Sequence, residues 1–341
     1  MTKSIVQQAQ GKEVPLVAQV FAELADGEFH SGEQLADTLG VTRSAVWKAV
    51  ESLRELGATL HAVRNRGYRL RSGSDALDAE RITSLLPVTV RSRARSIETA
   101  WTVDSTNSVL LARPNPPFGI CEIFLAEYQT AGRGRRGRTW VAPPGGSICL
   151  SLSWTFEQVP QELGALGLAI GVCALRTLKD FGIESALKWP NDILVDGKKL
   201  GGILIELRAE SDGPACVIIG IGLNVALGAS LLQTISGGNA LPPIDLVTAG
   251  LTQPSRNGLV ATLVSQVIPA LMAFEKDGLR PFVEEWRVAD ALRGSQVDVH
   301  TTEGVARGLA RGIDLHGALV VETPQGVKRF ISGDVTVRAV E

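Results

Sequence analysis

The stretch Glu127-Tyr-Gln-Thr-Ala-Gly-Arg-Gly-Arg-Arg-Gly-Arg-Thr-Trp140 directly follows an apolar run, 120–126, that predicts a buried strand. It carries four arginines and three glycines. Glycine lets backbone N–H groups approach an anion closely, and the planar guanidinium of arginine matches carboxylate or phosphate oxygens. The stretch therefore predicts a loop that holds a small anionic ligand, although its composition equally fits a solvated basic loop or a nucleic-acid patch.

The composition is that of a globular protein with several domains. The chain has 341 residues, 45% of them apolar and 21% charged, which is enough for two or three domains with proper cores. Its formal net charge of −2 supplies no attractive field for nucleic acid, so DNA binding requires a local basic patch. The first residues lack the apolar core of a signal peptide, and no apolar run reaches the ~18 residues of a membrane span. We expect a cytoplasmic protein without membrane contact.

The cysteines indicate a reducing compartment. None belongs to a C-x-x-C pair, and each stands in an apolar run, so buried free thiols are favoured over disulfides or zinc. They are Cys121, Cys149, Cys173 and Cys216.

The first seventy residues predict a helix-turn-helix. Helical spacing over 14–25 gives one helix, Ser31 is placed to cap a second over 33–39, and Thr42 to cap a third over 44–54. The exposed start of the third helix offers hydrogen-bonding and cationic side chains to base edges and phosphates. These are Thr42, Arg43, Ser44, Trp47 and Lys48.

A basic hairpin follows the three helices. Asn65-Arg66-Gly67 between two β-prone runs predicts a wing, with Arg64 and Arg66 facing the phosphate backbone and Arg71 as a further cation. Helical units without DNA contacts are common, but the basic wing favours DNA binding. Residues 71–75 read as a linker.

The next segments alternate between helices and strands. We expect helices over 75–86 and 163–181, and extended segments over 88–90, 96–103 and 146–154. Ser105, Thr106 and Asn107 open a short helix that reaches 111. They act either as a plain N-cap or as hydrogen-bonding partners of a neutral polar head group at that helix start.

A second hairpin brings polar and cationic residues together. Asp196-Gly197 is a strong turn signal between β-rich runs, so Asn191 and Asp192 should lie at one end of the hairpin and Lys199 near its turn, on the returning strand. The following strand, 217–224, has glycines where a ligand or another backbone comes close.

The sequence excludes several common chemistries. It has no Walker P-loop, no H-E-x-x-H and no G-x-S-x-G, and no G-x-G-x-x-G opens a helix. The histidines His30, His61, His300 and His316 stand outside the central part, so a histidine-based acid, triad or metal site is not expected there. Attack of a carboxylate on the α-phosphorus of ATP fits, because it needs no base and depends on charge neutralisation by Arg and Lys.

Four motifs in this order resemble the biotin protein ligases. They are Tyr128-Gln129 with Gly132-Arg-Gly-Arg-Arg-Gly-Arg138, Lys188-Trp-Pro-Asn-Asp192, Lys199-Leu-Gly-Gly-Ile-Leu204 and Gly220-Ile-Gly-Leu-Asn224. The winged helix resembles that of the bifunctional members, which also repress biotin operons.

The resemblance implies an α+β multidomain fold. It gives a winged helix-turn-helix at 1–72, a central mixed β-sheet with helices at 76–290, as in class II synthetases and biotin–lipoate ligases, and an SH3-like small barrel at 294–341. The barrel strands are expected at 297–300, 306–310, 317–322 and 327–331, with a turn at 311–314.

The resemblance also implies the activity and its partners. Biotin and ATP form biotinyl-5'-adenylate, with Mg²⁺ accompanying ATP and no dedicated protein metal site, and biotin then passes to a lysine of a biotin carboxyl carrier domain. Operator DNA and a ligand-induced homodimer, formed side by side along the sheets, are further expected partners.

Site residues carry over by motif. Biotin contacts are Ser105, Thr106, Asn107, Gln129, Gly132, Arg133, Gly134, Arg135, Lys199, Gly202 and Leu204. Lys199, Arg133 and Arg135 are the expected catalytic residues. ATP contacts are Trp140, Asn191, Asp192, Gly220 and Asn224.

One departure concerns the adenine. Repressor-type relatives stack an aromatic residue on it, whereas segment 226–241 has no aromatic here, so an aliphatic residue such as Leu231 or Leu232 would cover it with less stacking energy. Two other functions remain open: a lipoate ligase, which shares fold and chemistry, and a biotin sensor without enzyme activity. The arginine loop favours biotin over lipoate, and the intact Arg133, Arg135 and Lys199 favour an enzyme.

Overall fold

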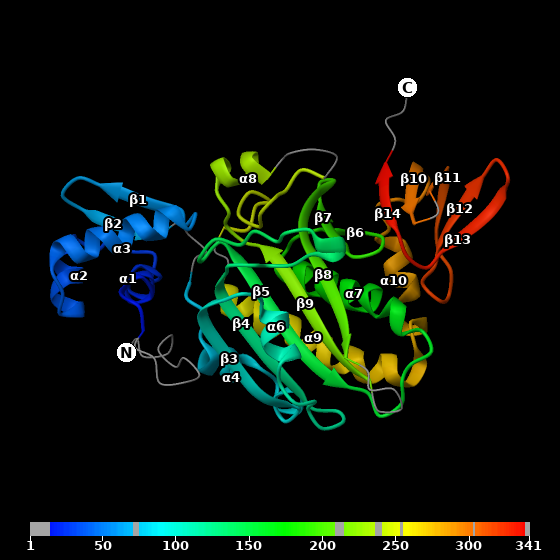
Figure 1. The fold of residues 1–341 in the computed structure, drawn as a ribbon, viewed down its shortest axis with the longest axis horizontal. Helices are drawn as coiled ribbons and strands as arrows, with labels where there is room; N and C mark the ends of the chain where they lie inside the picture. The colour runs from blue at the N-terminus through cyan, green and yellow to red at the C-terminus, as the bar shows by residue number, and fades with distance from the viewer. Residues whose placement is uncertain are drawn as a thin grey trace.

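Three parts follow one another along the long axis of the molecule (Figure 1). The computed structural model describes residues 14–70, 75–208, 215–235, 241–252, 255–302 and 304–337. A helical unit with a two-stranded sheet comes first, then a seven-stranded sheet with helices on both faces, then a five-stranded sheet. The expected linker at 71–75 lies, apart from Asp75, outside the described residues, as does Arg71.

The N-terminal unit is the predicted winged helix. Its elements are α1 (Leu16–Leu24), α2 (Gly32–Leu39), α3 (Arg43–Glu55), β1 (Leu60–Val63) and β2 (Gly67–Leu70). Ser31 accepts a hydrogen bond from the Gln34 N–H and Thr42 accepts one from the Ala45 N–H, which confirms both predicted N-caps. The backbone at His30 pairs with β2 of the wing like a third short strand, because His30 and Tyr68 exchange two backbone hydrogen bonds of 2.9 Å.

The central sheet has the strand order β3-β4-β5-β9-β8-β7-β6. Its strands are β3 (Ala94–Val103), β4 (Cys121–Gln129), β5 (Ser147–Thr155), β6 (Ala186–Lys188), β7 (Asp192–Val195), β8 (Lys198–Arg208) and β9 (Cys216–Asn224). β3 and β4 run parallel and the other described neighbours antiparallel, which confirms the predicted mixed sheet. The predicted turn at Asp196 and Gly197 has positive φ at both residues, 50° and 70°, as an Asp-Gly hairpin turn requires.

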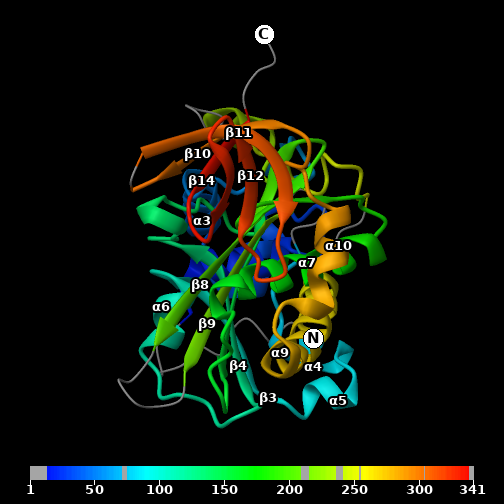
Figure 2. The same ribbon diagram turned by 90° about the vertical axis from the view of Figure 1, so that its right-hand side faces the viewer.

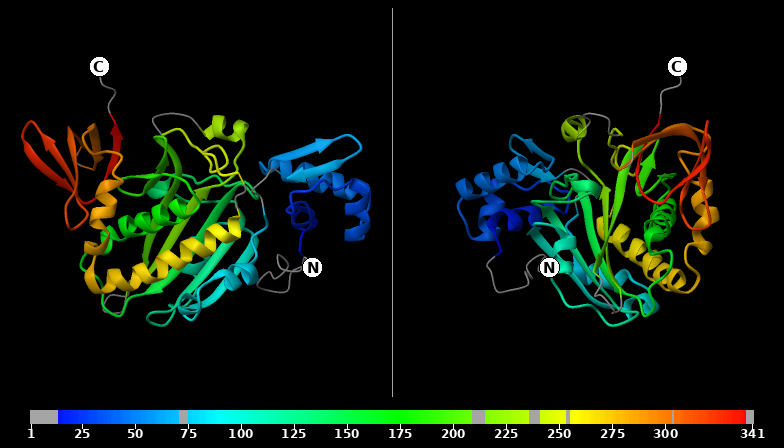
Figure 3. Two further views of the ribbon diagram at one scale, coloured as in Figure 1. Left: turned by 180° about the vertical axis from the view of Figure 1, so that it is seen from behind. Right: turned by 45° about the vertical axis from the view of Figure 1, so that its right-hand side comes forward.

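Helices cover the two faces of this sheet unequally. The short α6 (Thr106–Leu111) lies on one face, and α7 (Leu166–Asp180) and α9 (Arg256–Asp277) run across the other (Figures 1 and 3). The main core lies between the sheet and these two long helices. Further elements are α4 (Ala79–Leu85), α5 (Val88–Arg91), η2 (Arg135–Gly137), η3 (Leu163–Ala165), α8 (Ala229–Ile235), η4 (Arg280–Phe282) and α10 (Val283–Val288).

The extended segment predicted at 88–90 is wrong. The β-branched valines favoured a strand, but Pro87 starts a single helical turn, because its carbonyl accepts hydrogen bonds from the N–H groups of Val90 (3.0 Å) and Arg91 (2.9 Å). Val90 is buried in the core beside α9, so tertiary packing overrides the local preference.

The C-terminal part is an antiparallel sheet of order β13-β12-β11-β10-β14, which curves on itself (Figure 2). Its strands are β10 (Gln296–Thr301), β11 (Gly304–Ile313), β12 (Leu319–Thr323), β13 (Gly326–Phe330) and β14 (Asp334–Val337). The predicted turn at 311–314 is wrong, because β11 continues to Ile313 through a β-bulge between Ala310 and Gly312. The chain reverses after Asp314 instead, and β14 was not predicted.

α9 is long and apolar enough to cross a membrane by length and composition alone. Its most apolar window is 61% buried within the protein, where the helix packs on α7 and on the sheet. This burial accounts for its apolar character, since a core helix passes the same test.

Both junctions between parts are packed. Trp101 of β3 is 3% exposed and belongs to the core of the winged helix, where its ring lies 5.3 Å from that of Phe21. At the other end, the Trp189 Nε1–H donates to the Gly317 carbonyl at 3.1 Å, which ties the C-terminal sheet to the segment before β7.

A buried ion pair anchors strand β4 of the central sheet to α9. The side chains of Glu127 and Arg256 are 1% and 0% exposed, and Glu127 Oε2 accepts hydrogen bonds from both terminal nitrogens of Arg256 at 2.7 and 2.6 Å. Glu127 Oε1 accepts a third from the Leu77 N–H at 2.7 Å. Burial raises the pKa of the Glu127 carboxyl, and the guanidinium of Arg256 acts against that rise. Asp75 caps the start of the same helix through the Arg256 N–H at 2.7 Å.

We predict that Glu127→Gln lowers the stability of the protein by about 3–5 kcal/mol, because it leaves the Arg256 charge buried without its counter-ion. The midpoint of urea unfolding measures this loss. Glu322→Gln removes an exposed partner of Arg311 and serves as the control, with an expected change below about 1 kcal/mol. Equal midpoints for the two variants would show that the buried pair contributes no more to stability than the exposed one.

Candidate functional site

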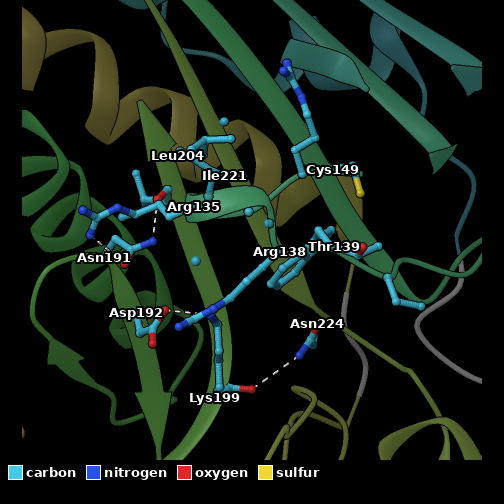
Figure 4. A pocket seen from close by; sticks show the side chains of 18 of the residues that line it. Arg135, Arg138, Thr139, Cys149, Asn191, Asp192, Lys199, Leu204, Ile221 and Asn224 are labelled. Atoms are coloured by element: carbon cyan, nitrogen blue, oxygen red, sulfur yellow. Dashed lines mark hydrogen bonds and ion pairs between the residues drawn. The ribbon is translucent and has the colours of Figure 1, made fainter. Parts of the chain in front are cut away.

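A cavity of about 580 Å³ lies beneath the loop that follows β4. Its walls come from α6, the strands β5, β8 and β9, the loop 132–140 and the segment 188–192. Figure 4 shows side chains from the loop, the three strands and the segment 188–192 around the cavity. The structure brings nearly all the predicted biotin and ATP residues together here. Those in the lining are Ser105, Thr106, Asn107, Gln129, Arg133, Gly134, Arg135, Trp140, Asn191, Asp192, Lys199, Gly202, Leu204, Gly220 and Asn224.

Gly132 is the predicted contact that does not line the cavity. A Cβ there would come within 2.4 Å of the Trp140 carbonyl oxygen, and the Gly132 carbonyl accepts from the Trp140 N–H at 2.9 Å. Gly132 therefore closes the base of the loop, where two backbone segments cross.

Glycines lower the floor of the cavity. Gly220 and Gly222 on β9 pair with Leu204 and Gly202 on β8. The space that a side chain at either β9 position would fill is occupied by another residue. A Cβ on Gly220 would meet Asn107 Oδ1 at 2.5 Å, and one on Gly222 would meet the Trp140 indole at 2.5 Å. These two glycines thus seat Asn107 and Trp140 directly on the sheet.

One end of the cavity is a buried network of neutral polar groups. Gln129 Oε1 accepts hydrogen bonds from the N–H of Thr106 (2.8 Å) and from its hydroxyl (3.2 Å). The Ser151 hydroxyl donates to Asn107 Oδ1 at 2.5 Å and lies 2.7 Å from the Thr106 hydroxyl. Ser105 occupies the N-cap position, but its side chain makes no capping hydrogen bond. These residues can recognise a neutral head group that both donates and accepts hydrogen bonds.

The other end is cationic. Lys199 Nζ lies 2.7 Å from Asp192 Oδ1, and Lys188 Nζ lies 3.9 Å from Asp192 Oδ2. The Asn191 side chain donates to the Ile203 carbonyl at 2.8 Å. Figure 4 shows Arg138 reaching from the loop toward Asp192 and Lys199. Such a group of cations can neutralise two anions that approach each other.

The two loop arginines expected to act together point to different ends. Arg133 Nη2 lies 3.1 Å from Glu206 Oε2, beside the neutral network. Arg135 Nη1 lies 3.5 Å from Asn191 Oδ1, at the cationic end (Figure 4). A loop conformation of this kind is not readable from its sequence.

Asn224 serves partly as a structural clamp. Its amide nitrogen donates to the Ile244 carbonyl at 3.0 Å and lies 3.4 Å from the Lys199 carbonyl. Lys199 in turn exchanges backbone hydrogen bonds with Pro242 and Ile244. Among the described residues of 226–243, Leu241 and Pro243 line the cavity, whereas Leu231 and Leu232 on α8 do not.

Several site residues were missed by sequence reasoning. Ser151, Glu206 and Arg138 contribute polar groups. Cross-strand register, which cannot be read from the sequence, places Ser151 opposite Gly220 and Glu206 opposite Ile218. His300 of β10 and Val335 of β14 also line the cavity. His300 reaches the cavity although it lies outside the central part of the sequence, because the C-terminal sheet docks onto the site.

The cysteines are the buried free thiols that the sequence predicted. Burial raises the pKa of the Cys121, Cys149 and Cys173 thiols to about 12. Cys149 lines the cavity, but its thiol stays protonated near neutral pH and is a poor nucleophile.

All the residues predicted to contact DNA are exposed. They are Thr42, Arg43, Ser44, Trp47 and Lys48 at the start of α3, and Arg64 and Arg66 at the tip of the wing. Phe29 holds two wing arginines, since the guanidinium carbons of Arg66 and Arg69 lie 4.4 and 4.6 Å from its ring centre. This contact preorganises cations along one edge of the wing.

Family patterns match three segments of the chain. Residues 17–69 match the HTH domain, 103–224 the Biotin/lipoate A/B protein ligase family and 294–338 the Biotin protein ligase C terminal domain. The chain is 37% identical to the bifunctional ligase/repressor BirA of Salmonella typhimurium and 36% identical to that of Escherichia coli. Each alignment covers 96% of this chain and 98% of the relative. The chain belongs to the BirA family of bifunctional ligase/repressors.

Two biotin ligases agree with this assignment. The biotin–[acetyl-CoA-carboxylase] ligase of Mycobacterium tuberculosis is 32% identical over 71% of this chain and 88% of its own length. The structure of biotin protein ligase from Aquifex aeolicus in complex with biotin and ATP has a TM-score of 0.59 and 25% identity, and covers 72% of this chain and all of its own. Membership of the BirA family confirms the predicted fold class and enzyme class.

Proposed function

We propose that the protein joins biotin and ATP into biotinyl-5'-adenylate and passes biotin to a lysine of a biotin carboxyl carrier domain. The single observation that carries this proposal is one cavity that joins a neutral polar end to the cationic end at Lys199, under an arginine loop. In the first step a carboxylate oxygen attacks the α-phosphorus and diphosphate leaves. In the second, the lysine amine attacks the acyl carbon, and AMP and a proton leave.

The neutral end suits the ureido ring of biotin. That ring offers N–H donors on either side of one carbonyl acceptor, and Ser105, Thr106, Asn107 and Gln129 supply both kinds of partner. Leu204 and Gly202 line the way toward the cationic end, where the biotin carboxylate would lie. Arg133 and Gly134 form the part of the loop that covers this path.

The cationic end suits the reacting anions. Lys199 is 29% exposed and its ammonium is oriented by Asp192, so it can reach both the carboxylate and the α-phosphate. Arg135 approaches the same region through Asn191. These groups neutralise the charge that develops on the phosphoryl oxygens, which is the main requirement of this reaction.

Trp140, Asn191, Asp192, Gly220 and Asn224 are proposed for the nucleotide side. Mg²⁺ would arrive with ATP, whose phosphate oxygens are its ordinary ligands. Among the described residues no group of three or more His, Cys, Asp or Glu side chains could hold a metal ion. Leu241 and Pro243 line the cavity and are proposed as the aliphatic groups that cover the adenine.

Incubation with ATP, labelled biotin and a carrier domain tests the proposal. Label transferred to the carrier is the expected result. Transfer of lipoate without transfer of biotin would make the protein a lipoate ligase, the other substrate class in the matched family. Biotin binding without any transfer would make it a sensor.

We predict that Lys199→Ala slows formation of the adenylate by roughly 10²-fold or more while biotin binding is partly kept, because the lost ammonium acts mainly on charge that develops during the reaction. Single-turnover adenylation and equilibrium biotin binding separate the two effects. Lys198→Ala, on the exposed neighbour, is the matched control. An unchanged single-turnover rate for Lys199→Ala would exclude the proposed role.

The winged helix supports a second activity, the repression of transcription by binding to operator DNA. The start of α3 would enter the major groove, with Arg64 and Arg66 of the wing on the phosphate backbone. A dimer that reads a palindromic site is the expected geometry, and β3 offers an open edge of the central sheet for side-by-side pairing. Sedimentation with and without biotinyl-adenylate tests whether the ligand drives dimerisation.

The proposal includes the division of the chain and its location. The ranges 1–72, 76–290 and 294–341 would correspond to the DNA-binding, catalytic and C-terminal domains. We propose a cytoplasmic location for both activities.

We predict that Phe29→Leu weakens operator binding roughly threefold to tenfold, because it removes the ring that orients Arg66 and Arg69. Fluorescence anisotropy with operator DNA at fixed salt measures the affinity. Phe29→Tyr keeps the ring and should bind as the wild type does. Loss of binding in both variants, or in neither, would contradict the role of the ring.

A further inference from the structure

Glu206 stands beside the cavity without lining it. It lies on β8 opposite Ile218, on the face that carries Leu204 and Gly202. One of its oxygens, Oε2, accepts a hydrogen bond from Asn107 Nδ2 at 2.6 Å and another from Arg133 Nη2 at 3.1 Å. A single carboxylate oxygen thus joins α6 to the arginine loop.

The contact with Asn107 fixes the neutral end of the cavity. Asn107 is 3% exposed, and its Oδ1 is taken by the Ser151 hydroxyl. Because a carboxylate accepts but does not donate, Glu206 forces the NH₂ group of Asn107 toward itself and the amide oxygen toward Ser151. A donor bonded to an ionised acceptor is held more firmly than one bonded to a neutral group.

The contact with Arg133 fixes the loop. Within the loop, Gly134 donates to the Arg138 carbonyl at 2.7 Å, and Arg133 and Thr139 form an antiparallel bridge. These bonds shape the loop but do not attach it to the sheet. The Arg133–Glu206 pair makes that attachment at the neutral end, and its side chains are 41% and 25% exposed, so the pair is partly open to solvent.

We propose that Glu206 is a positioning residue that couples the seat of the head group to the closed position of the arginine loop. It acts through Asn107 and Arg133 and does not touch the reacting atoms. Loss of its charge frees the loop at Arg133 and loosens Asn107 together, so biotin binds more weakly while the chemical step at Lys199 keeps its rate. The part that concerns biotin rests on the proposed function.

The first test uses the ligand-free protein. Trypsin cleaves after arginine, and the loop offers Arg133, Arg135, Arg136 and Arg138. Glu206→Gln keeps the shape of the side chain and removes its charge, so cleavage in the loop, followed by mass spectrometry, should be at least fivefold faster than in the wild type. Glu322→Gln breaks a distant exposed pair and should leave the rate unchanged. Equal cleavage rates in wild type and Glu206→Gln would overturn the proposal.

The second test is kinetic. Glu206→Gln should raise the KM for biotin about tenfold and change kcat less than threefold. A fall in kcat with an unchanged KM would overturn the positioning role and make Glu206 a group that acts on the reaction itself.

Arg133→Gln removes the loop partner of the same ion pair and leaves Glu206 on the sheet unchanged. It should speed cleavage after the remaining arginines as Glu206→Gln does, and the double variant should be no faster than either single one. Additive effects would show that the two residues act separately. This variant also tests the proposal if Glu206→Gln does not fold. Faster cleavage without any biotin transfer by the wild type would leave the coupling intact and refute only the proposed function.

Discussion

The pairing of Glu127 with Arg256 is the constraint on which the arrangement of the molecule depends. Two charges without solvent contact are tolerated only when they satisfy each other, so β4 and the start of α9 must meet at this point. Glu127 also accepts from the Leu77 N–H, and Asp75 caps α9. The chain that leaves the winged helix is thereby attached to the strand that ends at Gln129 in the cavity. One buried pair thus fixes the position where the arginine loop begins and the position where the chain leaves the DNA-binding part.

The site itself is built from a sheet and a loop. On the sheet, Gly220 and Gly222 let Asn107 and Trp140 lie close to β9. The loop 132–140 covers the cavity, and its arginines divide between the neutral end and the cationic end. A substrate that is neutral and polar at one end and anionic at the other can bind in such a cavity in only one orientation. Specificity then comes from the separation of the two ends as much as from any single contact.

The sequence predicted local structure well and spatial pairing poorly. The caps at Ser31 and Thr42, the Asp196-Gly197 turn and the motif residues around Lys199 all rest on short-range chemistry, and the structure has each of those local elements. Ser151 and Glu206 were missed because, in a buried strand, only register shows which neighbour a side chain meets. His300 was missed because docking of a distant sheet brings it to the cavity. The helical turn at Val88 was not predicted, because packing against α9 outweighs the preference of valine for strands.

Trp101 carries a consequence for how the two activities can separate. Its indole belongs to β3 of the ligase part, yet it is buried in the core of the winged helix against Phe21. Excision of the DNA-binding part would uncover a large aromatic surface on an edge strand, which is a site for aggregation. A shorter descendant with ligase activity alone would therefore need a polar substitution at position 101 as well as the deletion. The two functions are joined by a shared core residue, and the loss of one is a two-step event.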